Sequence, residues 1–530
     1  MSIPHFERIN GKKVLFVHDR PMILSAGEIH NSSSSSPERM ETLWDRAEAL
    51  GMNALLIPVT WQMIEPEEGS FDFTLTDALI DQARRRGGHL GILWFGSWKN
   101  GECMYAPEWV KRDMDRFPRA EVVKGKNRTK IDLFGGLSYS TLSYLGAETL
   151  KADSRAFSAL MRHLREKDGE ENTVVYVQVE NESGVMGAVR EHSDLADEVF
   201  AGPVPASLAE YLRANTGEMD EDLKHSVEGG MASGTWSEVF GESAEEVFSA
   251  YHVASYINAV AAAGKAEYRL PMVVNCWLKQ GPAGSYPTGG PIHQMMEVWE
   301  CAAPEIEAFC PDIYVQYFLE VCDSFVKRGN PLFIPETANN GHVGSRLVYA
   351  VGNYHAACFA PFAYEEIGDV KPNPFAEMFG GDSTDPLLKQ QQDIAEYRMY
   401  SSTILSMTPM LAAAYGTGRL QAAIAERGES ASMEFTDIGF TAQFPERFFP
   451  KKDGVCLILE ESPECFYILA NRVLPRFYSV NPDKPDAEIL SLEEGYFENG
   501  EWKRTLLRNG DELNLMAFEP VLYRLRIFVY

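Results

Sequence analysis

The sequence lacks several features that would place it in other classes of protein. It has no apolar run long enough to span a membrane, and no excess of positive charge, since its formal net charge is −29. An acidic chain repels nucleic acid and anionic membrane surfaces, so neither is expected as a partner. The first residues hold no apolar segment of the kind found in signal peptides, and we therefore expect a cytoplasmic protein.

Cysteine and histidine are too scattered to form a metal site or a disulfide framework. None of the eight cysteines stands in a Cys-x-x-Cys pair, and the eleven histidines show no paired ligand spacing. We expect reduced cysteines in the core, no metal and no cofactor. The length of 530 residues exceeds one ordinary domain and suits a barrel followed by a smaller module.

The chain is organised around an apolar run that ends in carboxylates. Residues 174–179 are mostly β-branched or aromatic and predict a buried strand, which ends in Glu180-Asn181-Glu182. A second short run, residues 331–335, ends in Glu336. In α/β barrels the carboxyl ends of the strands form the catalytic edge, and two carboxylates across a pocket are what glycosidic bond cleavage requires. Taken singly, either glutamate could be a strand end that meets water.

The stretch Gln178-Val179-Glu180-Asn181-Glu182 resembles the acid/base motif of the β-galactosidases of glycoside hydrolase family 35, within the clan of retaining (β/α)8 glycosidases. In that clan the Asn-Glu pair closes barrel strand four, and the nucleophile closes strand seven. The resemblance implies that Glu182 is the acid/base, Glu336 the nucleophile and Asn181 a ligand of the sugar 2-hydroxyl. It therefore implies a TIM barrel that acts on a small carbohydrate.

A polar and aromatic cluster follows the predicted third barrel strand. Sugar sites combine an aromatic platform with donors and acceptors for hydroxyls, and Trp98, Lys99 and Asn100 offer both. The alternative is a packed loop with a solvated lysine. Together with Tyr105-Ala106-Pro107-Glu108-Trp109, the cluster resembles a branch of family 35 that carries an extra C-terminal domain.

Three further residues are candidates for contact with the sugar or the nucleophile. The stretch Ser25-Ala26-Gly27-Glu28-Ile29-His30 resembles the opening motif of family 35, where the glutamate faces the sugar; a solvated strand end is the alternative. Trp277 follows the predicted fifth strand and could stack on a sugar or pack in the core. In this clan a strand-six tyrosine bonds the nucleophile, which suggests Tyr314, with Tyr317 as the rival and a core role open for both.

Strand and helix signals alternate along the first four hundred residues. Expected barrel strands lie at 22–26, 54–59, 89–94, 174–179, 271–275, a run ending at 312–314, 331–335 and 358–362. Expected helices lie at 37–50, where Ser36 is the N-cap, and at 75–86, 153–166, 244–265, 293–303 and 385–414. Residues 101–145, with Phe134–Ser140 among them, predict a long loop that shapes the mouth of the site, and residues 183–243 a polar surface excursion.

The sequence pattern changes from helical to strand-like after the last predicted helix. From Met433 onward, short alternating strands separated by Asn-Gly turns predict a β-sandwich. We therefore expect a catalytic (β/α)8 barrel with an N-terminal hairpin over residues 1–415, and a C-terminal β-sandwich over residues 416–530. The second domain shows no chemistry, and we expect it to pack against the barrel or, in a homo-oligomer, against a neighbouring subunit.

Three functional hypotheses follow. The first is a retaining exo-β-galactosidase. The second keeps the chemistry but changes the sugar to a β-glucoside, a β-xyloside or an α-L-arabinopyranoside. It stays open because many family 35 members carry a tyrosine three residues before Trp61 and a histidine before Glu65, where this chain has Pro58 and Ile64. The third is a carbohydrate-binding protein on an inactive barrel.

Overall fold

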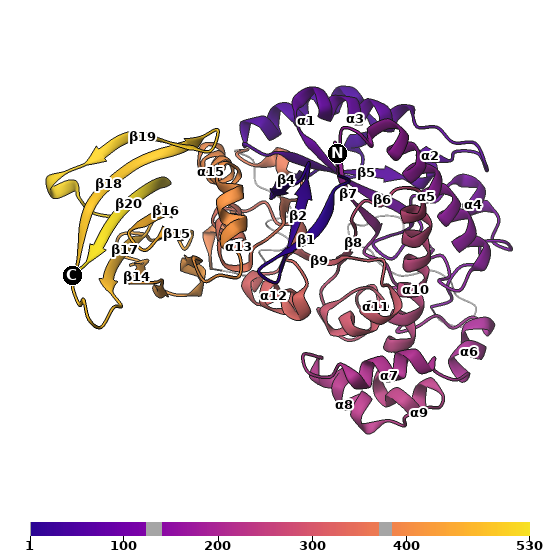
Figure 1. Ribbon diagram of the computed structural model, residues 1–530. Coiled ribbons are helices and arrows are strands. Elements are labelled where there is room, and N and C mark those ends of the chain that lie inside the picture. Colours follow the sequence, from indigo (N-terminus) through magenta and orange to yellow (C-terminus); the bar gives the residue numbers. More distant parts are fainter. Residues whose placement is uncertain (1, 123–139, 370–383) are drawn as a thin grey trace.

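Eight parallel strands close into a barrel, as the sequence predicted. The computed structural model describes residues 2–122, 140–369 and 384–530 (Figure 1). Around the barrel the order is β10-β11-β4-β5-β6-β7-β8-β9, so barrel strands one to eight are β4 to β11. The strands are β4 (Leu24–Glu28), β5 (Ala54–Thr60), β6 (His89–Lys99), β7 (Val174–Asn181), β8 (Met272–Cys276), β9 (Ala308–Ile313), β10 (Phe333–Thr337) and β11 (Cys358–Pro361).

Three short antiparallel strands precede the barrel. They are β1 (His5–Ile9), β2 (Lys12–Val17) and β3 (Arg20–Met22), paired in the order β1-β2-β3. His18 and Asp19 join β2 to β3, and both have positive φ, 52° and 60°, as a tight type I′ hairpin turn requires. The expected hairpin is therefore present and gains one strand.

Helices surround the barrel and follow the predicted caps. The Ser36 hydroxyl accepts a hydrogen bond from the backbone N of Arg39 at 3.2 Å and starts α1. Gly87, with φ 68°, ends α3 in the left-handed conformation. The outer helices are α1 (Pro37–Ala49), α3 (Thr74–Arg86), α5 (Ala147–Asp168), α10 (Ala244–Glu267), α11 (Met296–Ala302), α12 (Phe318–Phe325), α13 (Val343–Tyr354) and α15 (Ile394–Ala414). Two short helices, α2 (Trp61–Ile64) and α4 (Glu108–Arg112), lie in loops.

Three local expectations were wrong or incomplete. Strand β6 continues to Lys99 rather than ending at Trp94, because it contains a bulge that hides the period of two. The last helix begins at Ile394 after the Asp393 cap, and Asp385 caps a separate 3-10 turn. The polar excursion after Glu182 contains helices with short buried faces, namely α6 (Asp194–Ala201), α7 (Ala206–Ala214), α8 (Glu221–Gly229) and α9 (Trp236–Phe240).

The long loop of residues 101–145 is described only in part. Residues 123–139 lie outside the described residues, so the expectation that Phe134 to Tyr139 shape the mouth belongs to a stretch that is not described. None of the helices within the described ranges has a stretch long and apolar enough to cross a bilayer.

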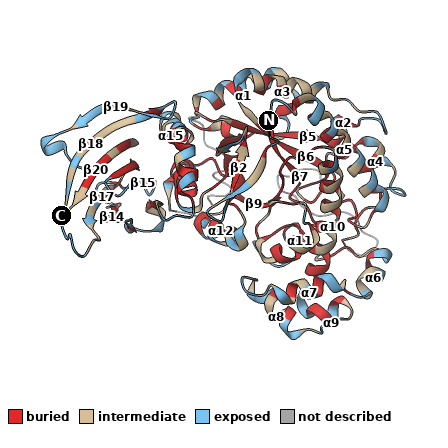
Figure 2. Cartoon of the chain, in the orientation of Figure 1, coloured by how far each residue is buried: buried red, intermediate tan, exposed pale blue. Residues whose placement is uncertain are grey.

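The core has two shells around the barrel strands (Figure 2). One fills the barrel interior with side chains such as Leu56, Phe95 and Phe333, and the other packs the strands against the helices. Seven of the eight cysteines are buried and Cys301 is half-buried, with all eight free. The expectation of reduced, mostly core cysteines is confirmed. The strands thus form a rigid support for side chains at the barrel's carboxyl edge.

Two antiparallel sheets form the C-terminal domain. The six-stranded sheet has the order β12-β15-β16-β20-β18-β19 and the three-stranded sheet β13-β14-β17, with a second apolar core that draws residues from both. The strands are β12 (Leu420–Ile424), β13 (Ser430–Glu434), β14 (Ile438–Gln443), β15 (Val455–Ser462), β16 (Cys465–Asn471), β17 (Leu474–Ser479), β18 (Ala487–Glu498), β19 (Glu501–Arg508) and β20 (Val521–Val529). The predicted β-sandwich is confirmed.

The C-terminal domain lies against α13 and α15 of the barrel (Figure 1). At Gly352 of α13 an added Cβ would lie 2.7 Å from the Ala422 Cβ of β12 and 2.9 Å from Leu457 of β15. A larger residue would push the helix off the sheet. Apolar residues of β12 and β15 belong to the same buried cluster as the barrel's outer core, so the two domains share packing.

Candidate active site

Two buried glutamates lie at the carboxyl edge of the barrel. Glu182 directly follows β7, and Glu336 lies in β10, three strands further around the barrel. Their exposed fractions are 6% and 7%, so both are withdrawn from bulk water. The carboxyl edge is where barrel enzymes place their chemistry, and the structure brings the two predicted catalytic residues to it.

A hydrogen bond to its backbone N–H fixes the position of Glu182. Its N–H donates to Asn275 Oδ1 at 2.9 Å, and Asn275 Nδ2 donates to Asp312 Oδ2 at 2.7 Å. Its φ of 43° is one that non-glycine residues rarely adopt, and such positions, costing on the order of 1 kcal/mol or more, concentrate at functional sites. Burial raises the pKa of Glu182 to about 7, Lys99 opposes the rise and the charge of Glu336 adds to it. Near neutral pH this carboxyl can both give and take a proton.

Glu336 is bound by a tyrosine and lies beside another carboxyl. The Tyr314 hydroxyl donates to Glu336 Oε1, whereas the rival Tyr317 is 48% exposed. Burial, followed by the charge of Glu336, raises the pKa of Glu28 well above its ordinary value. The protonated form of Glu28 is therefore favoured, and in that form it can donate a hydrogen bond to Glu336.

Lys99 bridges the third and fourth barrel strands at the mouth. Its Nζ donates to Asn181 Oδ1 at 2.9 Å and lies 5.1 Å from the centre of the Phe95 ring. Burial alone would lower the pKa of Lys99, but the charges of the nearby carboxyls, Glu336 first, outweigh burial and raise it. Lys99 is therefore a fixed positive charge within a ring of carboxyls, rather than the solvated lysine of the alternative interpretation.

Two amide groups at the mouth offer unused hydrogen-bonding atoms. Asn181 Nδ2 and Asn100 Oδ1 are buried, and neither has a hydrogen-bond partner within the described residues. Buried polar atoms of a folded protein are rarely left unpaired unless a ligand or water completes them. Asn100 directly follows β6 with φ 53°. Both atoms fit contact with sugar hydroxyls.

Two aromatic candidates pack against the outer core of the barrel. Trp98 is 1% exposed, and its ring meets Tyr256 of α10 edge-to-face at 4.7 Å, in the layer between strands and helices. It differs from its expected place as a sugar platform because it shares the outward face of β6 with Ile92 and Trp94. Trp277 is half-buried and packs against the same outer core. Both positions favour packing.

Sequence reasoning missed four polar residues that organise the mouth. Asn275 and Asp312 end barrel strands five and six, so the same carboxyl-edge argument could have found them. Glu180 and Asp153 lie behind the mouth, and only their spatial contact singles them out. Burial, followed by the charges of neighbouring carboxyls, raises the pKa of Asp312 well above its ordinary value.

The described part of the chain contains no group of three or more His, Cys, Asp or Glu side chains arranged to hold a metal ion.

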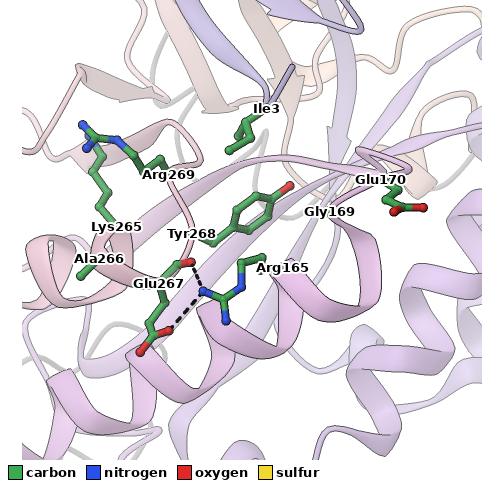
Figure 3. Close-up of a pocket in the computed structure, with 9 residues that line it drawn as sticks. All are labelled: Ile3, Arg165, Gly169, Glu170, Lys265, Ala266, Glu267, Tyr268 and Arg269. Atoms are coloured by element: carbon green, nitrogen blue, oxygen red, sulfur yellow. Dashed lines mark hydrogen bonds and ion pairs between the residues drawn. The ribbon is translucent and has the colours of Figure 1, made fainter. Parts of the chain in front are cut away.

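A separate open pocket lies at the other end of the barrel (Figure 3). Its lining comes from the C-terminal ends of α5 and α10, which precede β7 and β8, and includes the Arg165–Glu267 ion pair. It contains none of the candidate site residues.

Comparison with protein families gives two matches. The model for glycosyl hydrolases family 35 matches residues 14–111, a span from β2 to α4 that includes barrel strands one to three. This part of the barrel is therefore similar to the glycosyl hydrolases of family 35. A second model, a domain of unknown function called DUF5597, matches residues 397–518 and so covers most of the C-terminal domain. The resemblance to the family 35 branch with an added domain is thereby confirmed.

Solved structures with similar folds are glycosidases of several kinds. The catalytic domain of the β-amylase from Paenibacillus polymyxa is 11% identical with a TM-score of 0.43, covering 65% of this chain and 93% of that one. The β-galactosidase from Rahnella sp. R3 is 14% identical with a TM-score of 0.45, covering 74% of this chain and 57% of that one.

The exo-β-1,4-mannosidase Op5Man5 from Opitutaceae bacterium strain TAV5 is 10% identical with a TM-score of 0.44; the match covers 77% of this chain and 63% of that one. This chain thus spans less than two thirds of the Rahnella and Opitutaceae enzymes. Similarity at these identities and TM-scores says nothing about substrate. Among curated proteins none matches the chain.

Proposed function

We propose that the protein is a retaining exo-glycosidase that removes terminal β-D-galactosyl residues from oligosaccharides or glycosides by double displacement. The observation that carries the proposal is the contrast between two carboxyls at one barrel edge. Burial raises the pKa of Glu182 to about 7, whereas Glu336 accepts a hydrogen bond from Tyr314. Paired carboxyls in different environments are how glycosidases separate a proton donor from a nucleophile.

In the first step Glu182 protonates the glycosidic oxygen while a Glu336 oxygen attacks the anomeric carbon. The bond from that carbon to the leaving oxygen breaks, and a glycosyl ester of Glu336 forms. Tyr314 holds one Glu336 oxygen by its hydrogen bond, and the other oxygen is the one that attacks. Asn181, whose Nδ2 lacks a partner in the described structure, can donate a hydrogen bond to the sugar 2-hydroxyl.

In the second step Glu182 acts as the base. Formation of the ester removes the charge of Glu336, which is one cause of the raised pKa of Glu182. The pKa of Glu182 therefore falls in the intermediate, and its carboxylate takes a proton from water as the water attacks the anomeric carbon. The bond from that carbon to Glu336 breaks, which releases the sugar and restores the Glu336 carboxylate. Lys99, which lowers the pKa of Glu182, favours the same change.

A second candidate keeps this chemistry but changes the sugar to a β-glucoside, a β-xyloside or an α-L-arabinopyranoside. Pro58 lies within β5, and Ile64 is 2% exposed in α2. Neither offers the hydrogen bonds that the tyrosine and histidine of many family 35 members would supply there. The sugar contacts of this chain must therefore come partly from other residues.

One experiment tests these alternatives together. Hydrolysis of 4-nitrophenyl β-galactoside, β-glucoside, β-xyloside and α-L-arabinopyranoside is measured with the wild-type protein and with Glu336→Ala as the control. We expect the galactoside to have the highest kcat/KM, and proton NMR to show the β-anomer as the first product. An α-anomer as first product would exclude retention. Binding without hydrolysis would instead support the carbohydrate-binding barrel.

A further inference from the structure

A second pair of carboxyls lies directly behind the candidate site. Asp153 of α5 and Glu180 of β7 are 0% and 1% exposed and lie between the barrel and its helices. None of the groups with the largest effects on the pKa of either carboxyl is a lysine, arginine or histidine. Two buried carboxylates without a cation would repel each other strongly, so the pair needs a proton.

The hydrogen bonds around the pair show where that proton fits. Asp153 accepts three hydrogen bonds. Trp94 Nε1 donates to Oδ1 at 3.1 Å, and the hydroxyls of Ser97 and Tyr256 donate to Oδ2 at 2.6 and 3.1 Å, respectively. Glu180 Oε2 accepts one, from the backbone N of Trp98 at 2.8 Å. Glu180 Oε1 is buried and has no donor among the described residues.

The unpaired oxygen of Glu180 lies beside Asp153. A Cβ added to Gly96 would lie 2.6 Å from Glu180 Oε1 and 2.9 Å from Asp153 Oδ1, so both oxygens border the same small space. The absent side chain of Gly96 leaves that space for the two carboxyls. A proton on Oε1 would give Glu180 the partner it lacks.

We propose that Glu180 is protonated at Oε1 and donates a hydrogen bond to an ionised Asp153, and that this bond makes Glu180 the positioning residue for Lys99 and Glu182. The role toward Glu182 rests on the proposed function. Formation of the pair requires one proton, which the side chain of Glu180 takes up from solvent when the chain folds at neutral pH. Burial, followed by the charge of Asp153, raises the pKa of Glu180 well above its ordinary value. Tyr256, the other titratable group at the pair, has its pKa raised by burial and stays neutral.

The pair acts through the bulge in β6. Between the pairings Trp94–Val179 and Lys99–Asn181, β6 advances five residues while β7 advances two. Three of the four donors to the carboxyl pair, namely Trp94, Ser97 and the backbone N of Trp98, belong to this stretch of β6. Glu180 and Asp153 therefore hold the bulge in the shape that returns Lys99 to Asn181, next to Glu182.

The position of the proton is tested by stability across pH. In Glu180→Gln the amide reproduces both bonds, since its oxygen accepts from Trp98 and its NH2 donates to Asp153. A carboxyl with a raised folded pKa loses stability as pH rises from its ordinary value toward the raised one. We expect the Tm of Glu180→Gln to rise relative to the wild-type Tm as pH increases across that window. Asp153→Asn should have a lower Tm than Glu180→Gln. The proposal would be overturned if the Tm difference between Glu180→Gln and wild type did not change with pH, or if Asp153→Asn had the higher Tm of the two variants.

The positioning role is tested by activity per folded molecule. Glu180→Leu keeps the volume but removes both hydrogen bonds, and we expect kcat to fall about a hundredfold, the scale of a small misplacement of catalytic groups. The alkaline limb of its kcat/KM profile should move to higher pH, because a displaced Lys99 no longer lowers the pKa of Glu182. Glu180→Gln should restore both kcat and the pH of the limb.

If folded Glu180→Leu kept the wild-type kcat and the same alkaline limb of kcat/KM, Glu180 would not be a positioning residue for Lys99 and Glu182. If the wild-type protein hydrolysed no glycoside, the proposed function would fail. The Tm comparison of Glu180→Gln with Asp153→Asn would still decide where the proton lies.

Discussion

The mouth of the barrel and its contact with the C-terminal domain both bury charged side chains, but they pair them differently. At the contact, Arg346 of α13 binds Glu426 through two nitrogens at 2.6 and 3.0 Å. Arg472 binds Glu396 at 2.8 Å and Asp453 at 3.2 Å. Burial would raise the pKa of Glu426, but Arg346 and His342 outweigh it and lower the pKa.

At the mouth the carboxyls outnumber their partner. Glu28, Glu182, Asp312 and Glu336 face Lys99, and burial raises the pKa of the first three. Matched charges favour one fixed state, whereas crowded like charges leave groups whose protonation changes near neutral pH. The contact therefore favours stability, whereas the mouth holds carboxyls in an environment that favours a change of protonation.

The largest expected effect is the loss of the nucleophile. Glu336→Ala cannot form the glycosyl ester, so we expect hydrolysis of every glycoside to fall by a factor on the order of 10⁵ to 10⁶, the scale of losing a covalent nucleophile. Added azide should enter the vacated space and yield the α-glycosyl azide, identified by NMR. A β-azide from this variant would reverse the roles of the two glutamates.

Loss of the acid/base should depend on the leaving group. In Glu182→Ala we expect turnover of poor leaving groups to fall by about 10²- to 10⁴-fold, the usual worth of general acid–base catalysis. The first step with dinitrophenyl glycosides should survive, because dinitrophenolate needs little protonation, and azide should give the β-glycosyl azide. Equal loss on all leaving groups would show that Glu182 is not the proton donor.

The sequence predicted the barrel and its two glutamates because both depend on local signals. Buried parallel strands are short apolar runs, and their polar ends mark the catalytic edge. The bulge in β6 was not predictable in this way, since it breaks the alternation that marks a strand. Trp98, expected at the mouth, lies in the outer layer on the same face of β6 as Trp94.

The distinct roles of Glu180 and Glu182 were also out of reach of the sequence. Residues two apart in a strand point to the same face, so both glutamates should share one environment. Positive φ values of 63° and 43° break that rule, and Glu180 meets Asp153 while Glu182 lies near Glu336 and Lys99. Such a reversal depends on tertiary contacts that no local pattern records.

Breaking the domain contact should change stability and spare catalysis. Arg346→Met removes the main partner of the half-buried Glu426, with only His342 left beside it, and breaking a buried pair from one side costs about 3–5 kcal/mol of the free energy of unfolding. The double variant Arg346→Met/Glu426→Leu should recover part of this loss, since no charge stays buried alone. Thermal and urea unfolding measure both. A single variant with wild-type Tm would show that the ion pair contributes little to the contact.

The smallest effect should come from Lys99, which connects charge balance at the mouth to pH dependence. Lys99 lowers the pKa of Glu182, so Lys99→Met should raise it above about 7. An opposite charge nearby commonly moves a carboxyl pKa by about one unit or more. Because Glu182 must be protonated to act as the acid, the alkaline limb of kcat/KM should move to higher pH by a similar amount. Lys99→Arg keeps the charge and should keep the limb. Any loss of sugar contact lowers the height of the profile in both variants without moving its limb, so the position of the limb isolates the electrostatic role. A limb that moves to lower pH in Lys99→Met would mean that the carboxyl titrating there is not Glu182.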